Sequence, residues 1–226
     1  MDNQRQHILV INPNSDESVT EGMFRELRGF HFSEGPEIEC VNLPDGPFSI
    51  ESQADIEAVT LPLRKMVSES RNVDAFVIAC YSDPGLHVCR ETSEKPVFGI
   101  QECGILTAMS RGDRFGVIAL QERSIRRHLR YLRQIGVMER LAGERAAGLS
   151  VVESVSGKDT FEKLLAAAKQ LKVSDQADTI ILGCAGMASH RAKLESAIGI
   201  PVINPVQAAV SMAMHSLLTK QQYENS

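Results

Sequence analysis

The cysteines are the side chains whose chemistry we consider first, because a thiolate can move protons or attack carbon. Five occur, Cys40, Cys80, Cys89, Cys103 and Cys184. Their odd number, and a chain large enough to stabilise itself by core burial, argue against a disulfide framework. Neither a Cys-x-x-Cys pair nor clustered histidines occur, so we expect no metal site.

An internal repeat selects two of these cysteines. Each is preceded by an apolar run that begins after an aspartate, and each is followed by a helix-like stretch and a Pro-Val segment. The first pair of segments matches with one residue of slippage. The sequence therefore predicts two copies of one fold, with Cys80 and Cys184 at equivalent places, whereas Cys40 and Cys89 are predicted to be core residues. The matching segments are 74–80 with 178–185, 96–100 with 201–205, and 7–12 with 114–119.

The elements that must position these cysteines alternate between short apolar runs and longer segments of helical period. This pattern predicts an α/β fold with buried parallel strands. We expect two pseudo-symmetric domains, each an open parallel sheet flanked by helices, with the active site in the cleft between them. The first would span 1–102 plus the C-terminal helix 205–226, and the second 103–204. The expected strands are 8–11, 38–43, 75–80, 97–100, 115–120, 149–152, 179–182 and 201–203.

Five short motifs, in the same order along the chain, resemble the aspartate/glutamate/hydantoin racemase superfamily and most closely its hydantoin racemase branch. The resemblance covers nearly the whole chain. It implies proton transfer without a cofactor between two cysteines, which map onto Cys80 and Cys184. The motifs are Ile11–Ser15, Gly46–Glu51, Ala79–Leu86, Leu182–Met187 and Pro201–Val206.

The chain departs from the amino-acid racemases of this superfamily beside each cysteine. Those enzymes usually carry Asn-Thr or Thr-His there, whereas this chain has Tyr81-Ser82 and Ala185-Gly186. The loss of these polar groups argues against aspartate or glutamate and favours a neutral ring bound largely by backbone N–H groups. We therefore predict a two-base racemase or epimerase acting on a carbon acid such as a 5-substituted hydantoin or allantoin.

Two opposed thiol groups suit such a reaction, because one base does not easily reach both faces of a stereocentre. Ser82-Asp83-Pro84 predicts a helix start, with Asp83 as cap and the positive end of the helix dipole directed at Cys80. The residues that we expect to bind substrate are Asn12, Ser15, Ser49, Tyr81, Ser82, Gly85, Glu102, Ala185, Gly186 and Asn204.

Several of these residues also have a structural interpretation. Gly85 and Gly186 could serve tight turns, and Ser15 could belong to a helix-capping loop. Asn204 fits an N-cap of the last helix, with Gln207 completing a capping box. Glu102 could orient a ligand or favour a helix start. The sequence alone does not exclude its neighbour Cys103 from the active site.

Composition limits the other function classes. A chain of 226 residues with 43% hydrophobic residues and a net charge of −5 is typical of a globular protein. The Arg-rich segment 123–133 has Ile125, Leu129 and Leu132 at helical spacing, which predicts a surface helix with a solvated basic face. We expect a cytoplasmic homo-oligomer with a small-molecule substrate, no cofactor, and neither nucleic-acid nor membrane partners.

Alternatives within and outside this chemistry stay open. The superfamily also contains maleate isomerases, arylmalonate decarboxylases and amino-acid racemases, and the decarboxylases keep one cysteine. A non-catalytic ligand-binding module would keep the fold without the chemistry.

Overall fold

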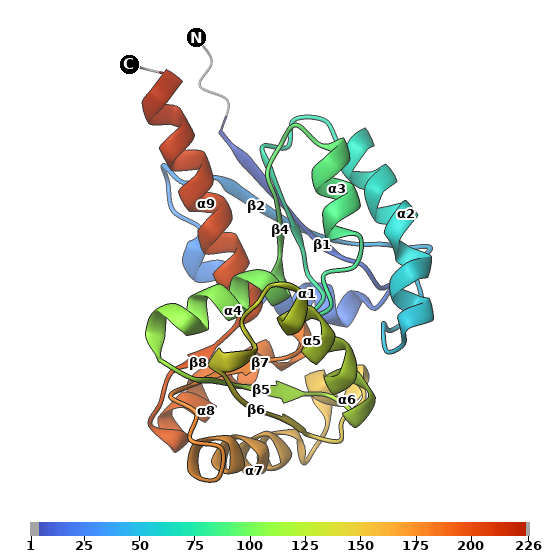
Figure 1. Cartoon of the computed structure of the whole chain (residues 1–226). Coiled ribbons are helices and arrows are strands. Elements are labelled where there is room, and N and C mark those ends of the chain that lie inside the picture. Colours follow the sequence, from blue (N-terminus) through green and yellow to red (C-terminus); the bar gives the residue numbers. More distant parts are fainter. Residues whose placement is uncertain (1–4, 225–226) are drawn as a thin grey trace. The chain divides into compact units, whose positions relative to one another are not determined.

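The computed structural model of the chain describes the backbone of residues 5–224 and the side chains of residues 5–219. The chain divides into two compact units, drawn in Figure 1. Unit 1 comprises Met1–Ile100 and Val206–Ser226, and unit 2 comprises Gln101–Pro205. The boundaries expected from the sequence lie beside these divisions, but that each unit is an independent domain stays a prediction.

Unit 1 is built on a parallel sheet of four strands in the order β2-β1-β3-β4. Alternate residues of β1 and β3, such as Leu9, Ile11 and Phe76, form an apolar core with one face of the helix 53–69. That helix begins at a capping box, in which Ser52 and Asp55 bind each other's backbone N–H. The elements are β1 (His7–Asn12), α1 (Glu17–Glu26), η1 (Arg28–Phe30), β2 (Glu37–Asn42), α2 (Gln53–Glu69), β3 (Ala75–Ile78), α3 (Leu86–Thr92) and β4 (Val97–Gly99).

Unit 2 repeats this plan with a parallel sheet in the order β6-β5-β7-β8. The predicted fold class, α/β with two parallel sheets flanked by helices, is confirmed. No helix in the described part of the chain is long and apolar enough to cross a membrane. The remaining elements along the chain, up to and including the C-terminal helix, are α4 (Ile100–Arg111), β5 (Phe115–Ala119), α5 (Glu122–Gln134), η2 (Met138–Arg140), β6 (Leu141–Ala146), α6 (Val151–Ser156), α7 (Thr160–Val173), β7 (Thr179–Leu182), η3 (Ala185–His190), α8 (Arg191–Ile198), β8 (Val202–Ile203) and α9 (Pro205–Glu224).

The last helix of each half belongs to the other unit. Helix α4 follows β4 of unit 1, but its residues from Gln101 onward belong to unit 2. Helix α9 follows β8 of unit 2, but from Val206 onward it belongs to unit 1, where the amide of Gln207 donates to the carbonyl of Glu26 at 2.9 Å. Unit 2 is therefore one continuous stretch of the chain, whereas unit 1 needs the C-terminal helix in addition to Met1–Ile100.

Strand register shows that the central strands of the two halves correspond residue for residue. Ala75 pairs with Ile8 in one sheet, and Thr179 pairs with Phe115 in the other. After the strands, Ala79 N–H donates to Ile11 O at 2.8 Å, and Gly183 N–H donates to Ile118 O at 2.9 Å. The segments 74–80 and 178–184 thus match without the slippage expected from the sequence.

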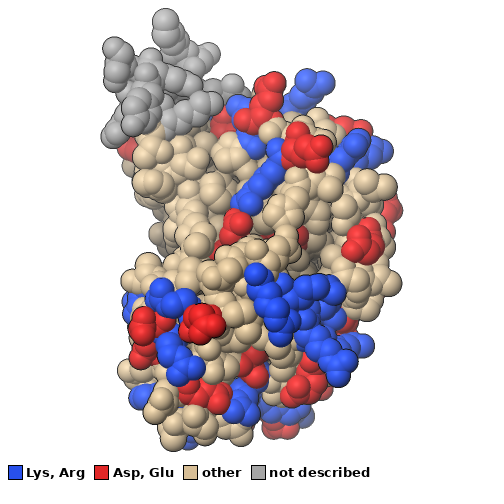
Figure 2. All heavy atoms as spheres, viewed as in Figure 1, with Lys and Arg blue, Asp and Glu red and all other residues tan. Residues whose placement is uncertain are grey.

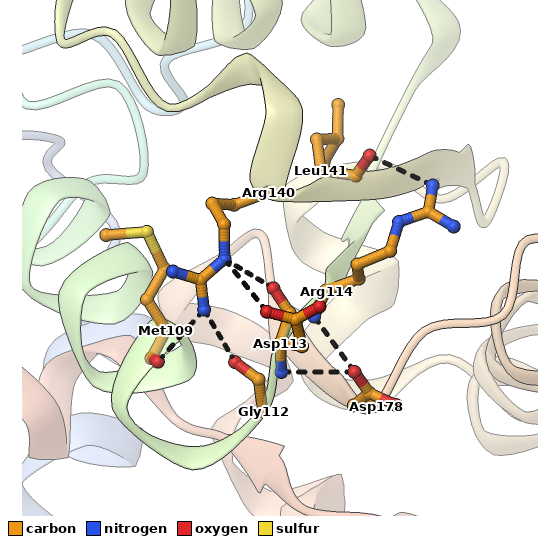
Figure 3. A network of polar contacts seen from close by, with 7 residues as sticks. All are labelled: Met109, Gly112, Asp113, Arg114, Arg140, Leu141 and Asp178. Atoms are coloured by element: carbon orange, nitrogen blue, oxygen red, sulfur yellow. Dashed lines mark hydrogen bonds and ion pairs between the residues drawn. The ribbon is translucent and has the colours of Figure 1, made fainter.

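The aspartate before each central strand has the same structural task. The carboxylate of Asp74 accepts the N–H of His7 at 3.0 Å, and that of Asp178 accepts the N–H of Arg114 at 2.9 Å. In return, Asp74 N–H donates to His7 O and Asp178 N–H to Arg114 O, both at 2.8 Å. Each aspartate therefore fastens the start of the neighbouring strand, as Figure 3 shows for Asp178.

Arg140 caps the C-terminal end of helix α4. Its guanidinium donates to the carbonyl of Met109, in the last turn of the helix, and to those of Gly112 and Asp113 immediately after it (Figure 3). These carbonyls have no partner within the helix, so a cation at this end both satisfies them and favours the helix dipole.

One predicted strand is wrong and another was missed. Residues 149–152 do not form a strand, because Ser150 and Glu153 make a capping box that begins α6. The strand is β6, Leu141–Ala146, whose residues are all half-buried and include Glu144 and Arg145. It lies at the edge of its sheet and lacks the continuous apolar run by which buried strands are recognised.

Candidate active site

Each sheet reverses its strand order at the strand before a candidate cysteine. In unit 1 the reversal lies between β1 and β3, and in unit 2 between β5 and β7. Open parallel sheets bind ligands beyond the carboxyl ends of the strands at such a switch point. Cys80 follows the end of β3 and Cys184 follows the end of β7, so each unit presents its cysteine where a ligand is expected.

The turns after the two cysteines also match. The carbonyl of Cys80 accepts the N–H of Asp83 at 2.9 Å, and the carbonyl of Cys184 accepts the N–H of Met187 at 3.2 Å. Both cysteines are half-buried, so neither is enclosed in a hydrophobic core. The repeat inferred from sequence therefore extends into the loops that hold these cysteines.

The other three cysteines have different surroundings. Cys89 and Cys103 are buried, and burial raises the pKa of Cys89 to about 11. Cys40 is half-buried on the edge strand β2, so its assignment to the core is wrong. Burial, and to a lesser degree the nearby Glu39, raise the pKa of the Cys40 thiol to about 12. Cys40 and Cys89 therefore stay protonated at neutral pH.

Asn12 organises the loop that leaves β1. Its side chain is fully buried, and its amide donates to Asn14 Oδ1 at 2.8 Å, Thr20 Oγ1 at 3.0 Å and the Asp16 carbonyl at 3.2 Å. Asp16 is the N-cap of α1 and accepts the N–H of Ser18. The buried Asn12 side chain thus fixes the conformation of this loop through its hydrogen bonds. Direct binding of substrate by Asn12 stays a prediction.

Ser15 and Ser49 come from two adjoining loops of unit 1. Ser15 N–H donates to the Pro47 carbonyl at 3.0 Å, and its own carbonyl accepts the amide of Asn42 at 3.3 Å. Ser49 is half-buried and its hydroxyl donates to Glu51 at 3.3 Å. These bonds hold the loop 43–52 against the carboxyl ends of β1 and β2, and a ligand role for either serine stays a prediction.

The helix after Cys80 begins later than the sequence predicts. Helix α3 begins at Leu86, its N-cap is Gly85 in the left-handed region, and no side chain caps it. Asp83 is therefore not an N-cap; it lies in the turn after Cys80 with a positive φ of 42°. Gly85 has a φ of 67°, and a Cβ there would lie 3.3 Å from the backbone of Thr60, which supports the turn interpretation.

Asp83 fills the space above Gly99. Its side chain is buried, and a Cβ added to Gly99 would lie 2.2 Å from the Asp83 Cγ and 2.3 Å from Oδ2. The glycine at the end of β4 is thus required by the carboxylate that lies over it. In the turn between Cys80 and Asp83, Tyr81 is buried and Ser82 is half-buried.

In unit 2, Cys184 is the N-cap of η3 and its sulfur accepts the N–H of Gly186 at 3.4 Å. The Ser154 hydroxyl, on α6, lies 3.9 Å from the same sulfur. Sequence reasoning missed Ser154, and it assigned the neighbouring residues 149–152 to a strand. The Ser150-x-x-Glu153 pattern was the signal that could have placed a helix there.

The remaining predicted residues of unit 2 surround the ends of its elements. Ala185 is buried in η3, and Asn204 is buried immediately before α9. Glu102 is half-buried in the first turn of α4 and accepts the Tyr131 hydroxyl at 3.5 Å. Cys103 is buried beside it.

Helix α5 carries the basic face that the sequence predicts. Figure 2 shows Lys and Arg side chains gathered where Figure 1 places α5, and Arg123, Arg126 and Arg130 are exposed. The buried stripe differs from the expectation, since His128 lies in it and pairs with Glu144 of β6. Burying a charged side chain requires such a partner.

Comparisons with known proteins show which proteins this chain is similar to in sequence and in fold. Residues 8–213 match the family described as Asp/Glu/Hydantoin racemase. The chain is 38% identical over 214 residues to a hydantoin racemase of Rhizobium meliloti, covering 92% of this chain and 87% of that protein. It is 36% identical over 211 residues to the hydantoin racemase of Paenarthrobacter aurescens, covering 91% and 89%. An allantoin racemase structure from Klebsiella pneumoniae superposes with a TM-score of 0.89 at 32% identity, covering 96% of this chain and 89% of that one.

Proposed function

Because this chain belongs to the Asp/Glu/hydantoin racemase family, we propose that it is a cofactor-independent racemase of a cyclic carbon acid, with Cys80 and Cys184 as its two acid/base groups. The substrate is a 5-substituted hydantoin or allantoin. One cysteine serves each face of its stereocentre. Homo-oligomeric assembly and a cytoplasmic location remain predictions from the sequence.

The chemistry requires one thiolate and one thiol. The thiolate removes the proton from the stereocentre beside the ring carbonyl, and the opposed thiol returns a proton to the other face. The two cysteines exchange roles when the other enantiomer binds. A donor such as the Gly186 N–H, 3.4 Å from Cys184 Sγ, favours the thiolate form that this cycle needs.

The observation that carries the proposal is the equivalence of the two cysteines. Each follows a matching strand, lies at the switch point of its own sheet and begins a turn with the same hydrogen bond. Duplicated positions for one chemical group are what a reaction with two mirror-related proton transfers needs. The relatives named hydantoin racemase and the structure named allantoin racemase support the choice of substrate class.

A deuterium-exchange experiment tests this proposal. Each enantiomer of allantoin and of a 5-substituted hydantoin is incubated separately in D₂O, and the rate without enzyme is subtracted. The wild-type protein should interconvert the enantiomers, as followed by circular dichroism, and introduce deuterium at the stereocentre. Cys80→Ser and Cys184→Ser should each lower interconversion at least about 100-fold, because a hydroxyl is a far weaker base.

Cys40→Ser is the matched control, since it changes a half-buried cysteine outside the proposed site, and it should retain wild-type turnover. Racemisation by either Cys80→Ser or Cys184→Ser within about tenfold of wild type would reject the cysteine pair. A covalent substrate adduct on Cys80 would instead indicate maleate-isomerase chemistry. No exchange with hydantoins, allantoin or amino acids would indicate a binding module.

A further inference from the structure

We infer that Ser154 is a positioning residue that holds Cys184 in its protonated form in the resting protein. Its catalytic consequence rests on the proposed function, but its effect on the thiol does not. Ser154 is fully buried on α6, and its Oγ lies 3.9 Å from Cys184 Sγ.

The direction of the contact follows from counting protons. The Ser154 hydroxyl donates its single proton to the carbonyl of Val151, at 2.6 Å. Its oxygen therefore turns lone pairs toward the sulfur, and the Cys184 S–H is the donor of the pair. Lone pairs facing a sulfur stabilise the thiol and disfavour the thiolate.

The surrounding backbone fixes this arrangement. A Cβ at Gly186 would lie 2.4 Å from Ser154 Oγ and 3.1 Å from Val155 Cγ2, so only glycine allows η3 to approach α6 this closely. The capping box at Ser150 and the bond from Thr160 Oγ1 to the Glu153 carbonyl, 2.6 Å, hold α6 in place. Gly186 N–H and Ser154 Oγ thus act on one sulfur in opposite directions.

Charged groups on the elements packed around η3 have other contacts. Glu153 of α6 binds the N–H and hydroxyl of Ser150. On α8, Arg191 pairs with Glu195, and Lys193 lies over the ring of Phe161. The His190 ring of η3 itself lies 6.4 Å from the Phe161 ring. Strand β7 carries no titratable side chain.

In the reaction, this arrangement makes Cys184 the acid of the resting state. The enantiomer whose proton faces Cys80 meets a ready acid on its far side, whereas the other enantiomer requires Cys184 to lose its proton first. Ser154 therefore acts through Cys184 on the population of the two protonation forms of the cysteine pair, while the two directions of racemisation keep equal kcat/KM.

The test measures the titration of Cys184 directly. Native protein is pulsed with iodoacetamide across a range of pH, then digested with trypsin; the peptide 173–191 contains Cys184 as its single cysteine. Ser154→Ala should alkylate at least about threefold faster than wild type at pH 7, because its thiol loses a proton more readily. Ser154→Gly should shift the titration in the same direction, and Ser154→Thr, which keeps the hydroxyl, should follow wild type.

Thr160→Val is the matched control. It also removes a buried hydroxyl that donates to a carbonyl of α6 at 2.6 Å, but that hydroxyl does not bind Cys184. It should leave the titration of Cys184 unchanged. With substrate, Ser154→Ala should move the acidic limb of kcat/KM to lower pH by the same amount for both enantiomers, because their equilibrium constant is one and the limb reports the cysteine pair as a whole.

An alkylation rate in Ser154→Ala and Ser154→Gly that is equal to or slower than that of wild type would overturn the inference. An equal acceleration by Thr160→Val would also overturn it, because loosening of α6 would then be the cause. Should no substrate be turned over by the wild-type protein, the proposed function fails, while the alkylation series still decides the role of Ser154.

Discussion

Asp83 and Asn204 place polar groups at equivalent ends of the two sheets, but they do so from different positions. Gly99 pairs with Ile78 at the end of β4, and continuing the register of β8 makes Asn204 its counterpart. In unit 2 the strand end itself carries an amide. In unit 1 the strand end is a glycine, and the carboxylate lying over it comes from the turn that holds Cys80.

The energetic coupling between Gly99 and the Asp83 carboxylate can be measured. Gly99→Ala should destabilise the protein by about 1–3 kcal/mol, because its methyl would overlap the Asp83 carboxylate. Adding Asp83→Gly should recover more than half of that loss, since glycine also tolerates the positive φ at residue 83. Urea unfolding of the two single variants and the double variant measures the coupling. Strictly additive effects would contradict the contact.

The thiols should differ in reactivity as their surroundings differ. At pH 8, thiols with pKa values of about 11 and 12 are ionised to about one part in a thousand and one in ten thousand, so Cys89 and Cys40 should resist alkylation. Their reaction rises with pH and levels off only above these pKa values. Cys80 and Cys184 should be modified first in native protein, as mapped by mass spectrometry. Equal labelling of Cys40 and Cys80 at pH 8 would count against this assignment.

At the level of helices and strands, sequence reasoning succeeded where apolar pattern and burial agree. The central strands β1, β3, β5 and β7 are continuous apolar runs and were found, as was the Asp-to-Cys repeat. The prediction missed the edge strand β6, because its half-buried residues include both charged and apolar side chains. The predicted start of α3 was wrong, because Asp83 and Gly85 adopt positive φ values that a pattern of apolar residues does not reveal.

The two anchoring aspartates should have matching energetic roles. Asp178→Ala removes the acceptor of two backbone N–H groups, those of Asp113 and Arg114, and should lower the free energy of unfolding by about 1–3 kcal/mol. Asp74→Ala should have a similar effect through His7. Asp113→Ala is the control, because that side chain is exposed and its ion pair with Arg140 is long, 3.8 Å; it should change stability by less than about 0.5 kcal/mol. A loss as large in the control would refute the anchoring role.

For the whole chain, the decisive feature is that α9 completes unit 1 although it follows the sheet of unit 2. Sequence reasoning also placed this helix, residues 205–226, in the first domain. It could not have found Ser154 beside Cys184, because that contact joins two segments without any repeated or spaced pattern.

Two neighbouring substitutions test the membership of α9. Val210 is fully buried and Ser211 is exposed. Val210→Asp buries an unpaired charge and should lower the free energy of unfolding by about 3–5 kcal/mol. Ser211→Asp should leave the free energy of unfolding nearly unchanged. Hydrogen exchange should show lost protection in β1 and β3, with β5 and β7 retained. Protection lost first in β5 and β7 would assign α9 to the other unit.

The exchange of helices also sets the order in which the nascent chain can mature. Unit 2 is one uninterrupted stretch, Gln101–Pro205, so every segment it needs has been synthesised once Pro205 has been added. Unit 1 begins at the amino terminus, yet it must wait for Val206 and the residues beyond. All segments of unit 2 are therefore synthesised before the last segment of unit 1, the reverse of the order in which N-terminal domains are usually completed first.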